Sequence, residues 1–243
     1  MNNYIHISQN EIETTIFRYT PIEYVLPVIV KGQNALSSPR KWDDPFENML
    51  KLRKHPLRDR AYGQCWTLNE ETDAAWRMYV PMRNGVRLKT TIKKLYQSLI
   101  HSLHASNDPQ WKENGTIDPL AETACFIGRV QYKKEEEVKS WFTEPRLTNI
   151  GSQLQAESLL IKREAFVPEN EIRLIYLDPC NNGTNDYYTY NFELSNIIEQ
   201  ITFDPRMVDG LYDTYSRILH KFGYAGDISR STLYQVPKLE LPA

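Results

Sequence analysis

Two glutamates and an arginine stand close together at the start of an apolar run in the second half of the chain. They are Glu169, Glu171 and Arg173 of the segment ENEIR, which continues as LIYLD. In a strand that begins at residue 169, the three side chains point to one face, which places both carboxylates beside the guanidinium. The pattern predicts either a salt-bridged strand end or the acidic part of an active site, and these residues alone favour the ion pair.

A second group of carboxylates lies in the proline-containing segment PRKWDDPFEN. Asp43, Asp44 and Glu47, joined by Glu171, offer the oxygen ligands that Mg²⁺ prefers and that two-metal cleavage of a phosphodiester requires. The proline and phenylalanine of the segment instead favour a loop fixed by packing, in which Asp44 caps a turn or pairs with Arg173. We expect no metal cofactor and keep a metal site as an alternative.

Several segments must position these side chains. FRYTPIEYVLPVIVKG predicts the end of a strand at residues 17–19, followed by a helix that Thr20 caps and Gly32 ends. AYGQCWTL has the composition of a strand, and Trp76 and Tyr79 follow it at helical spacing. ACFIGRVQY indicates a further strand, and LLIKREAFVPENEIRLIYLD indicates two strands separated by a break that contains a proline.

The same patterns along the whole chain predict seven or eight strands and about five interspersed helices, with no clear linker between them. This arrangement indicates fold class α+β. We expect a single mixed domain over residues 1–243, with a central, largely antiparallel sheet flanked by helices.

Composition limits the classes of function. The chain has 243 residues, 41% of them apolar and 25% charged, and a formal net charge of -2. It therefore has no overall electrostatic attraction to nucleic acid or to an anionic membrane. The start MNNYIHISQNEIETT lacks the pattern of a secretory signal, and no run of eighteen apolar residues occurs. We predict a soluble, cytoplasmic protein without a membrane partner.

The order of these patterns resembles the bacterial family catalogued as domain of unknown function 2971. The resemblance covers nearly the whole chain. The family's asparagine-aspartate-proline-phenylalanine-glutamate loop corresponds to residues 43–47, where Asp43 replaces the asparagine. Its tryptophan-x-x-tyrosine helix corresponds to Trp76 and Tyr79, and its glutamate-x-glutamate-x-arginine strand to residues 169–173. Phe166 stands where a tryptophan is usual, and Met78 where a histidine is frequent.

Membership would imply a prokaryotic cytoplasmic protein, often encoded among mobile-element and anti-phage genes, with no agreed activity. A toxin or defence role is therefore expected, and a partner protein from the same operon is a further expectation.

The chain is also similar to arginine-type ADP-ribosyltransferases in the order of its polar residues: an arginine on an early strand, a hydroxyl on a middle strand and a glutamate pair on a later one. Arg18, Thr67, Glu169 and Glu171 stand in that order. In such a site the arginine holds the pyrophosphate of NAD, the hydroxyl braces the site, and a carboxylate stabilises the positive charge that develops as nicotinamide leaves. The resemblance implies an ADP-ribosyltransferase-like fold and NAD as the cofactor.

We therefore predict an ADP-ribosyltransferase-like enzyme that modifies an unidentified macromolecule, either a nucleic acid or a protein. Glu171 is the predicted catalytic carboxylate and Glu169 orients the acceptor. Arg18, Tyr19 and Tyr79 are predicted to contact NAD, and the hydroxyl of Thr67 is predicted to brace the site. Asp44, Glu47 and Arg173 are predicted to lie around the site and to position Glu171.

Two alternatives remain open: a metal-dependent nuclease of an anti-phage system, and a non-catalytic sensor or regulatory module. They differ in geometry. The transferase predicts a cleft lined by Arg18 and Glu171, and the nuclease predicts three carboxylates within reach of one metal. The binding module predicts that Arg173 occupies the glutamates in a dry ion pair.

Overall fold

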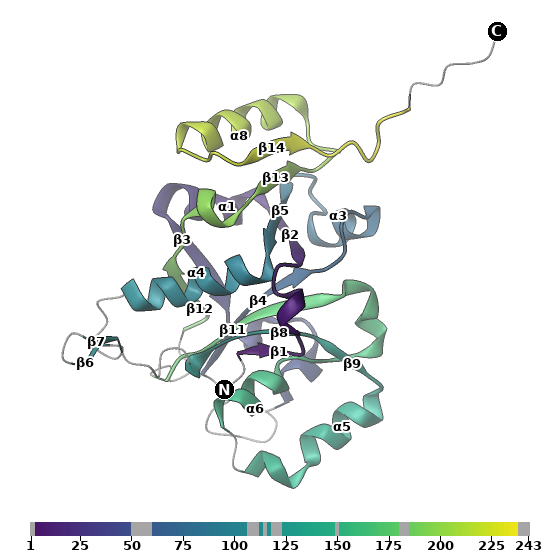
Figure 1. Ribbon diagram of the computed structural model, residues 1–243. Helices are drawn as coiled ribbons and strands as arrows, with labels where there is room; N and C mark the ends of the chain where they lie inside the picture. Colours follow the sequence, from purple (N-terminus) through teal and green to yellow (C-terminus); the bar gives the residue numbers. More distant parts are fainter. Residues whose placement is uncertain are drawn as a thin grey trace.

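A large mixed sheet forms the centre of the computed structural model, which describes residues 3–49, 60–105, 112–113, 116–117, 123–148, 151–179 and 185–237. Its main path runs β1-β8-β11-β4-β2-β5-β13-β14, and β3 and β12 branch from β4. Figure 1 shows this order from β14 beside α8 at one end to β1 near α6 at the other. The strands are β1 (Tyr4–Ile5), β2 (Thr15–Pro21), β3 (Gln33–Ser37), β4 (Ala61–Thr67), β5 (Gly85–Thr91), β8 (Cys125–Arg129), β11 (Glu171–Leu177), β12 (Tyr187–Asn191), β13 (Gln200–Phe203) and β14 (Asp227–Arg230).

Most pairs within this sheet are antiparallel. In the described part of the chain, only β1 with β8 and β13 with β14 are parallel there. The predicted fold class, a mixed domain with a central and largely antiparallel sheet, is therefore confirmed. Two small sheets lie beside it: β9 (Gln131–Lys133) with β10 (Ile161–Arg163), and β6 (Lys112–Glu113) with β7 (Thr116–Ile117).

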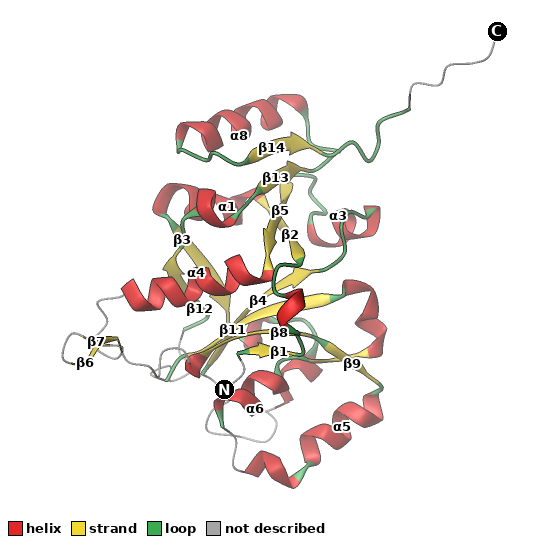
Figure 2. Ribbon diagram, in the orientation of Figure 1, coloured by secondary structure: helices red, strands yellow, loops and turns green. Residues whose placement is uncertain are grey.

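Helices flank the sheet, as Figure 2 shows in red. They are α1 (Ile22–Lys31), α3 (Asp73–Tyr79), α4 (Ile92–Ala105), α5 (Glu135–Thr143), α6 (Ser152–Ser158), α7 (Leu194–Ile197) and α8 (Asp209–Lys221). Short 3₁₀ helices are η1 (Gln9–Glu11), η2 (Pro39–Lys41), η3 (Pro45–Asn48), η6 (Pro145–Thr148) and η7 (Glu164–Glu169).

The two faces of the sheet carry different side chains, and the alternating residues of β11 show which side chains belong to each face. Ile172 and Leu174 belong to the main core with the buried side chains of α1 and α4, and we call this side the α4 face. Ile175 packs with Leu159 at the end of α6, and we call that side the α6 face. Because side chains alternate along a strand, Glu171 and Arg173 also point to the α6 face.

The start of α1 differs from its prediction. Thr20 does not cap the helix: β2 continues through Pro21, which occupies the capping position without a side-chain hydrogen bond. The pairing of β2 with β5 extends to Pro21 and Gly85, and this holds Thr20 in a strand conformation. The predicted end of the helix is confirmed, since Gly32 adopts φ of 63°, a left-handed conformation that glycine tolerates.

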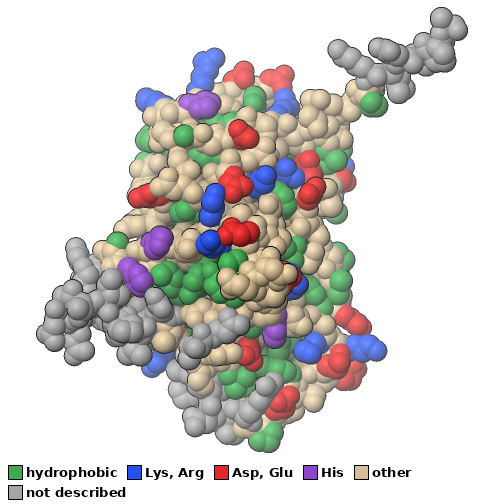
Figure 3. Space-filling model, viewed as in Figure 1, with side chains coloured by type: hydrophobic (Ala, Val, Ile, Leu, Met, Phe, Trp, Pro, Cys, Tyr) green, Lys and Arg blue, Asp and Glu red, His purple; other side chains and the backbone are tan. Residues whose placement is uncertain are grey.

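Acidic and basic side chains are interspersed on the face of the molecule seen in Figure 3, in keeping with the small net charge. Among the described residues, no helix has the length and apolar character needed to cross a membrane.

Candidate functional site

One row of side chains crosses the centre of the sheet on the α6 face. Glu171 of β11 pairs with Thr67 of β4, Thr67 pairs with Phe17 of β2, and Phe17 pairs with Lys89 of β5. Directly paired residues of antiparallel strands project to the same side, so these four side chains share a face. With strands about 4.8 Å apart, the row spans roughly 14 Å. Tyr19 lies in the next position along β2 on this face.

Arg18 does not join this row, which corrects the predicted cleft of Arg18 and Glu171. Arg18 follows Phe17 in the strand and therefore points to the α4 face. Its cross-strand partner is Leu88, a member of the main core. Order along the chain does not reveal on which face of a strand a side chain lies, and the prediction had relied on that order.

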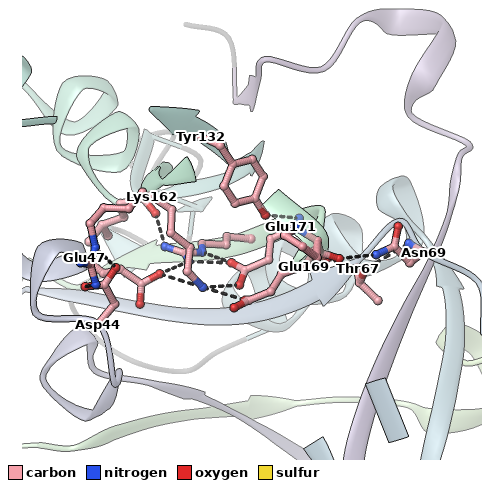
Figure 4. Close-up of polar contacts among 12 residues, drawn as sticks. Asp44, Glu47, Thr67, Asn69, Tyr132, Lys162, Glu169 and Glu171 are labelled. Atoms are coloured by element: carbon pink, nitrogen blue, oxygen red, sulfur yellow. Dashed lines mark hydrogen bonds and ion pairs between the residues drawn. The ribbon is translucent and has the colours of Figure 1, made fainter. Parts of the chain in front are cut away.

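Glu169 and Glu171 lie beside Lys162 (Figure 4), and Glu171 also contacts Arg173. Lys162 Nζ lies 2.7 Å from Glu169 Oε2 and 2.9 Å from Glu171 Oε1. Arg173 Nε donates to Glu171 Oε2 at 2.6 Å, and its Nη1 donates to the carbonyl oxygen of Leu159 at 2.7 Å. Both oxygens of Glu171 are therefore occupied by cations: Arg173 binds one of them, as the binding-module alternative predicted, and Lys162 binds the other.

The glutamates differ in exposure and in protonation. The side chain of Glu171 is 5% exposed, whereas that of Glu169 is 15% exposed. Burial alone raises the pKa of Glu171, but the charges of Arg173 and Lys162 and a hydrogen bond from Glu169 lower it to about 2. Burial and the hydrogen bond to Glu171 raise the pKa of Glu169 to about 7. Glu171 is thus a fixed carboxylate, and Glu169 gains or loses its proton near neutral pH.

Glu169 does not reach this position by strand alternation. It is the last residue of η7, and Asn170 follows with φ of 47° before β11 begins at Glu171. The predicted strand start at residue 169 is therefore wrong, although both carboxylates still lie together. The left-handed conformation of Asn170 turns the chain so that the side chain of Glu169 lies near Lys162 and Glu171.

The acidic loop supports this cluster in a different way from the predicted one. Glu47 Oε1 accepts a hydrogen bond from Arg173 Nη2 and lies 3.3 Å from Lys162 Nζ. Asp44 does not contact Arg173; it pairs with Arg163, whose Nη2 lies 2.9 Å from Asp44 Oδ1. Asp44 also accepts from the backbone N–H of Phe46 at 3.1 Å and so caps η3 as predicted.

The metal-dependent nuclease predicts three carboxylates within reach of one metal ion, and the described residues do not provide them. In the ranges that the structure describes, no group of three or more His, Cys, Asp or Glu side chains is placed to hold a metal ion. Instead, Asp44, Glu47 and Glu171 each face an arginine or lysine.

Thr67 and two asparagines hold the chain around Glu169. Thr67 Oγ1 donates to the carbonyl oxygen of Glu169 at 2.7 Å and accepts from the N–H of Asn69 at 3.0 Å. Asn69 Nδ2 donates to the carbonyl of Pro168 at 2.7 Å, and Asn170 Nδ2 donates to Asn69 Oδ1 at 3.1 Å. The predicted bracing residue thus fixes the backbone of the titrating glutamate.

Tyr79, Tyr19 and Trp76 pack together near Glu169, and we call these three side chains the aromatic wall. Tyr79 of α3 is partly exposed, and burial, followed by the nearby charge of Glu169, raises the pKa of its hydroxyl. Its ring is nearly parallel to that of Tyr19, with centroids 6.4 Å apart, and Trp76 packs edge-on against Tyr19 at 4.8 Å. Tyr19 itself is buried, with its hydroxyl donating to the carbonyl of Glu70 at 2.6 Å. Of the two predicted aromatic contacts, Tyr79 is the one with a free surface.

The residue of β5 that is paired with Tyr19 is basic. Arg87 is paired with Tyr19 in the sheet and lies over the ring of Phe17, 5.0 Å from its centroid. Its Nε is buried and has no hydrogen-bond partner among the described residues. The nearest carboxylate oxygen, of Glu71, is 3.9 Å from Nη1. Arg87 is therefore a loosely paired cation on the α6 face, and its buried Nε stays without a partner among the described residues.

Neither Lys162 nor Arg87 is among the predicted site residues, although the sequence allowed a phosphate contact for the basic group that contains Arg87. Lys162 occurs within the apolar run LLIKREAF, where a lone lysine signals a buried partner of opposite charge. Arg87 alternates with apolar residues in GVRLKT, a pattern that is typical of a half-exposed strand. Only the register against β2 shows that Arg87 shares a face with Tyr19.

A hollow of about 290 Å³ lies elsewhere, lined by part of α1, residues 191–196, Phe222 and Tyr224. It contains none of the predicted site residues. We therefore describe the site by the row of side chains on the α6 face.

No family model matches the chain, and no curated protein matches it. The resemblance to domain of unknown function 2971 stays a prediction. Among solved structures, the chain is similar to DarT of Thermus sp. 2.9 in complex with NAD⁺, with a TM-score of 0.41 and 10% identity, over 93% of this chain and 97% of that one. For DarT in complex with ADP-ribosylated ssDNA the TM-score is 0.39 at 9% identity, over 93% and 96%. Likeness at this level assigns no site or activity to the present chain.

Proposed function

We propose that this protein binds NAD on the α6 face and acts as an ADP-ribosyltransferase-like enzyme. One observation carries the proposal: Glu169, Tyr79, Tyr19 and Arg87 follow one another across neighbouring elements. Glu169 lies close enough to Tyr79 for its charge to raise the pKa of the Tyr79 hydroxyl, Tyr79 stacks near Tyr19, and Tyr19 pairs with Arg87. This second set of side chains, beside the row, therefore has an acidic end, an aromatic middle and a basic end.

These residues fit the chemical groups of NAD. The guanidinium of Arg87, whose side chain is 12% exposed, suits a pyrophosphate oxygen, since a guanidinium binds phosphate by charge-assisted hydrogen bonds. The partly exposed ring of Tyr79 offers a surface on which the flat nicotinamide ring can stack. Glu169 lies beside Tyr79 and offers a carboxylate that is ionised above about pH 7. Arg87 thus takes the role first predicted for Arg18.

NAD supplies an N-glycosidic bond whose cleavage leaves positive charge on the ribose. The carboxylate of Glu169 is placed to face that charge and to accept a hydrogen bond from a ribose hydroxyl. Lys162 and Thr67 hold Glu169 through its side chain and its backbone. Glu171 is more deeply buried and acts through Glu169, so we assign Glu169 as the catalytic residue and Glu171 as a positioning residue.

Several wider expectations belong to the same proposal. The acceptor is a macromolecule, nucleic acid or protein, and the protein acts in the cytoplasm in a toxin or defence setting. A member of the family of domain of unknown function 2971 would fit that setting.

The decisive experiment is isothermal titration of NAD into the purified protein, with nicotinamide release followed in parallel. We expect Arg87→Gln to weaken NAD binding by about tenfold or more, because it removes the charged phosphate donor. We expect Glu169→Gln to retain binding and to reduce nicotinamide release by about a hundredfold or more. Arg217→Gln on the exposed side of α8 and Glu164→Gln at the start of η7 are matched controls and should change neither quantity.

The outcomes separate the classes of function. NAD binding without nicotinamide release, in the wild type and in the variants alike, would identify a binding module, the class favoured by the buried ion pairs of Glu171. Absence of NAD binding at millimolar ligand would refute the proposal.

A further inference from the structure

Helix α8 lies at the end of the molecule beyond β14 and is only lightly covered (Figure 1). Of its residues, all of which the structure describes, only Leu219 is buried. The ring of Tyr212 packs edge-on against Phe203 of the main core, with centroids 5.3 Å apart. The helix therefore rests on the α4 face by a narrow contact and leaves a wide side open to solvent.

An apolar stripe continues beside this contact. Five apolar residues follow one another at alternating spacings of three and four, which places them along one side of the helix. We call them the α8 stripe: Val208, Leu211, Tyr215, Ile218 and Phe222. Val208 is 63% exposed, Leu211 41% and Phe222 52%, whereas Tyr215 and Ile218 are half-buried. Two helices pack along a shared seam by this spacing, so the stripe fits a second helix.

The α8 stripe ends at a hollow. The hollow of about 290 Å³ is lined by Phe222 itself, by Val28 and Ile29 of α1 and by Leu194 of α7, among others. Exposed apolar side chains thus stand at the start of the stripe, and a depression with apolar walls lies at its end. Such a surface is complementary to a copy of itself when the two copies run in opposite directions about a twofold axis.

The charged side chains of α8 favour the same direction. Asp209 and Asp213 lie in the first half of the helix, Arg217 and Lys221 lie in the second half, and all four are exposed. Asp209 contacts Arg230, yet its side chain is 88% exposed. Antiparallel helices bring the acidic half of each close to the basic half of the other and oppose the two helix dipoles, whereas parallel helices would bring like charges together.

We propose that α8 is the interface of a symmetric dimer, in which the α8 stripes of two copies pack antiparallel about an axis near Tyr215. Val208 of each copy then lies opposite Phe222 of the other, beside the hollow, because both are seven positions from Tyr215. A helix of 13 residues forms a small interface, and small interfaces belong to weak complexes, so we expect a dissociation constant in the micromolar range. The pairing uses none of the residues of the proposed NAD site, which lie on the α6 face.

Sedimentation equilibrium of the full chain over a range of protein concentrations tests the dimer. The wild type should change from monomer to dimer as the concentration rises. Val208→Glu and Phe222→Lys should each weaken self-association by about tenfold or more, because each places an unpaired charge against an apolar side chain. The matched control is Met82→Glu, at a side chain that is 78% exposed and lies outside α8, and it should leave the dissociation constant unchanged.

A mixture of the two variants tests the direction of the helices. In an antiparallel pair of one Val208→Glu chain and one Phe222→Lys chain, the new carboxylate and the new ammonium lie opposite each other at one end. The original Phe222 and Val208 meet at the other end. The mixture should therefore associate more tightly than either variant alone, and this recovery would also show that both variants are folded.

Three outcomes would overturn the proposal. A wild type that stays monomeric at the highest concentration would leave the α8 stripe to a different chain. A dimer that neither substitution weakens would have its interface on another surface. A mixture that associates no more tightly than its components would contradict the antiparallel arrangement.

Discussion

At the scale of single residues, the site depends on two carboxyl groups of the same type that are held in opposite protonation states. Arg173 and Lys162 keep Glu171 ionised, while burial and the bond to Glu171 keep a proton on Glu169 to about pH 7. Pairs of this kind are frequent in active sites, because one group stays charged while the other exchanges a proton. The difference between them has a measurable effect on stability.

We predict that Glu169 makes the folded protein less stable as the pH rises from 4.5 to about 7. The folded state binds the proton of Glu169 more tightly than the unfolded state, whose pKa is near 4.5, so stability falls across that window and stays lower above it. Glu169→Gln removes this loss. Relative to the wild type, its free energy of unfolding in urea should gain about 2 kcal/mol between pH 5 and pH 8.

Glu164→Gln, in the exposed first turn of η7, is the matched control and should show no such gain. If the difference between the wild type and Glu169→Gln is the same at both pH values, Glu169 does not titrate in this window.

At the scale of elements, α3 is the helix that positions the aromatic wall, and its end is fixed from another part of the chain. Arg206 Nη2 donates to the carbonyl oxygens of Trp76 and Val80, at 3.0 Å each. The same guanidinium pairs with Asp204, whose carboxylate is fully buried. Arg206 therefore adds a charged donor to the carbonyl groups of Trp76 and Val80, which also accept from the N–H groups of Val80 and Arg83, and it balances a buried charge.

We expect Arg206→Gln to destabilise the protein by about 3 kcal/mol, because it leaves the carboxylate of Asp204 buried without its cation. Amide hydrogen exchange within residues 73–79 should accelerate along with the loss of global stability. The control is Arg77→Gln, which breaks an exposed ion pair with Asp73 on the same helix and should leave the unfolding temperature unchanged. Equal effects of the two variants would contradict the proposed support of α3.

The helices and strands could largely be predicted from the sequence. The face of the sheet to which each side chain points could not. Helical spacing of Trp76 and Tyr79 predicted α3, and the apolar run after Glu171 predicted β11, because local periodicity determines both. The misplaced start of β11 reflects one left-handed residue, Asn170, which no periodicity reveals. Arg18 was assigned to the wrong face because the single pairing of Phe17 with Thr67, a tertiary feature, sets the register between β2 and β4.

At the scale of the whole molecule, Arg173 joins segments that are far apart in the sequence. Its side chain is 1% exposed, donates to Glu171 on β11, to Glu47 in the acidic loop and to the carbonyl of Leu159 after α6, and lies 4.6 Å from the ring centroid of Trp42. The loop and the helix are thus fastened to the centre of the sheet by one guanidinium. A buried charge network of this kind stabilises the fold little more than well-packed apolar side chains would. Removing one member is strongly destabilising, because it leaves the other charges buried without their partner.

We therefore predict unequal costs for single and paired substitutions. Arg173→Met should lower the free energy of unfolding by about 4 kcal/mol, because Glu47 and Glu171 then share only Lys162. Adding Glu47→Gln should restore part of that loss, since it removes the excess negative charge, whereas Glu47→Gln alone should destabilise. Lys94→Met, which breaks the exposed pair with Glu199, is the control and should change little. Urea unfolding of the four variants gives the coupling energy directly, and additive losses would show that Glu47 and Arg173 stabilise the fold independently.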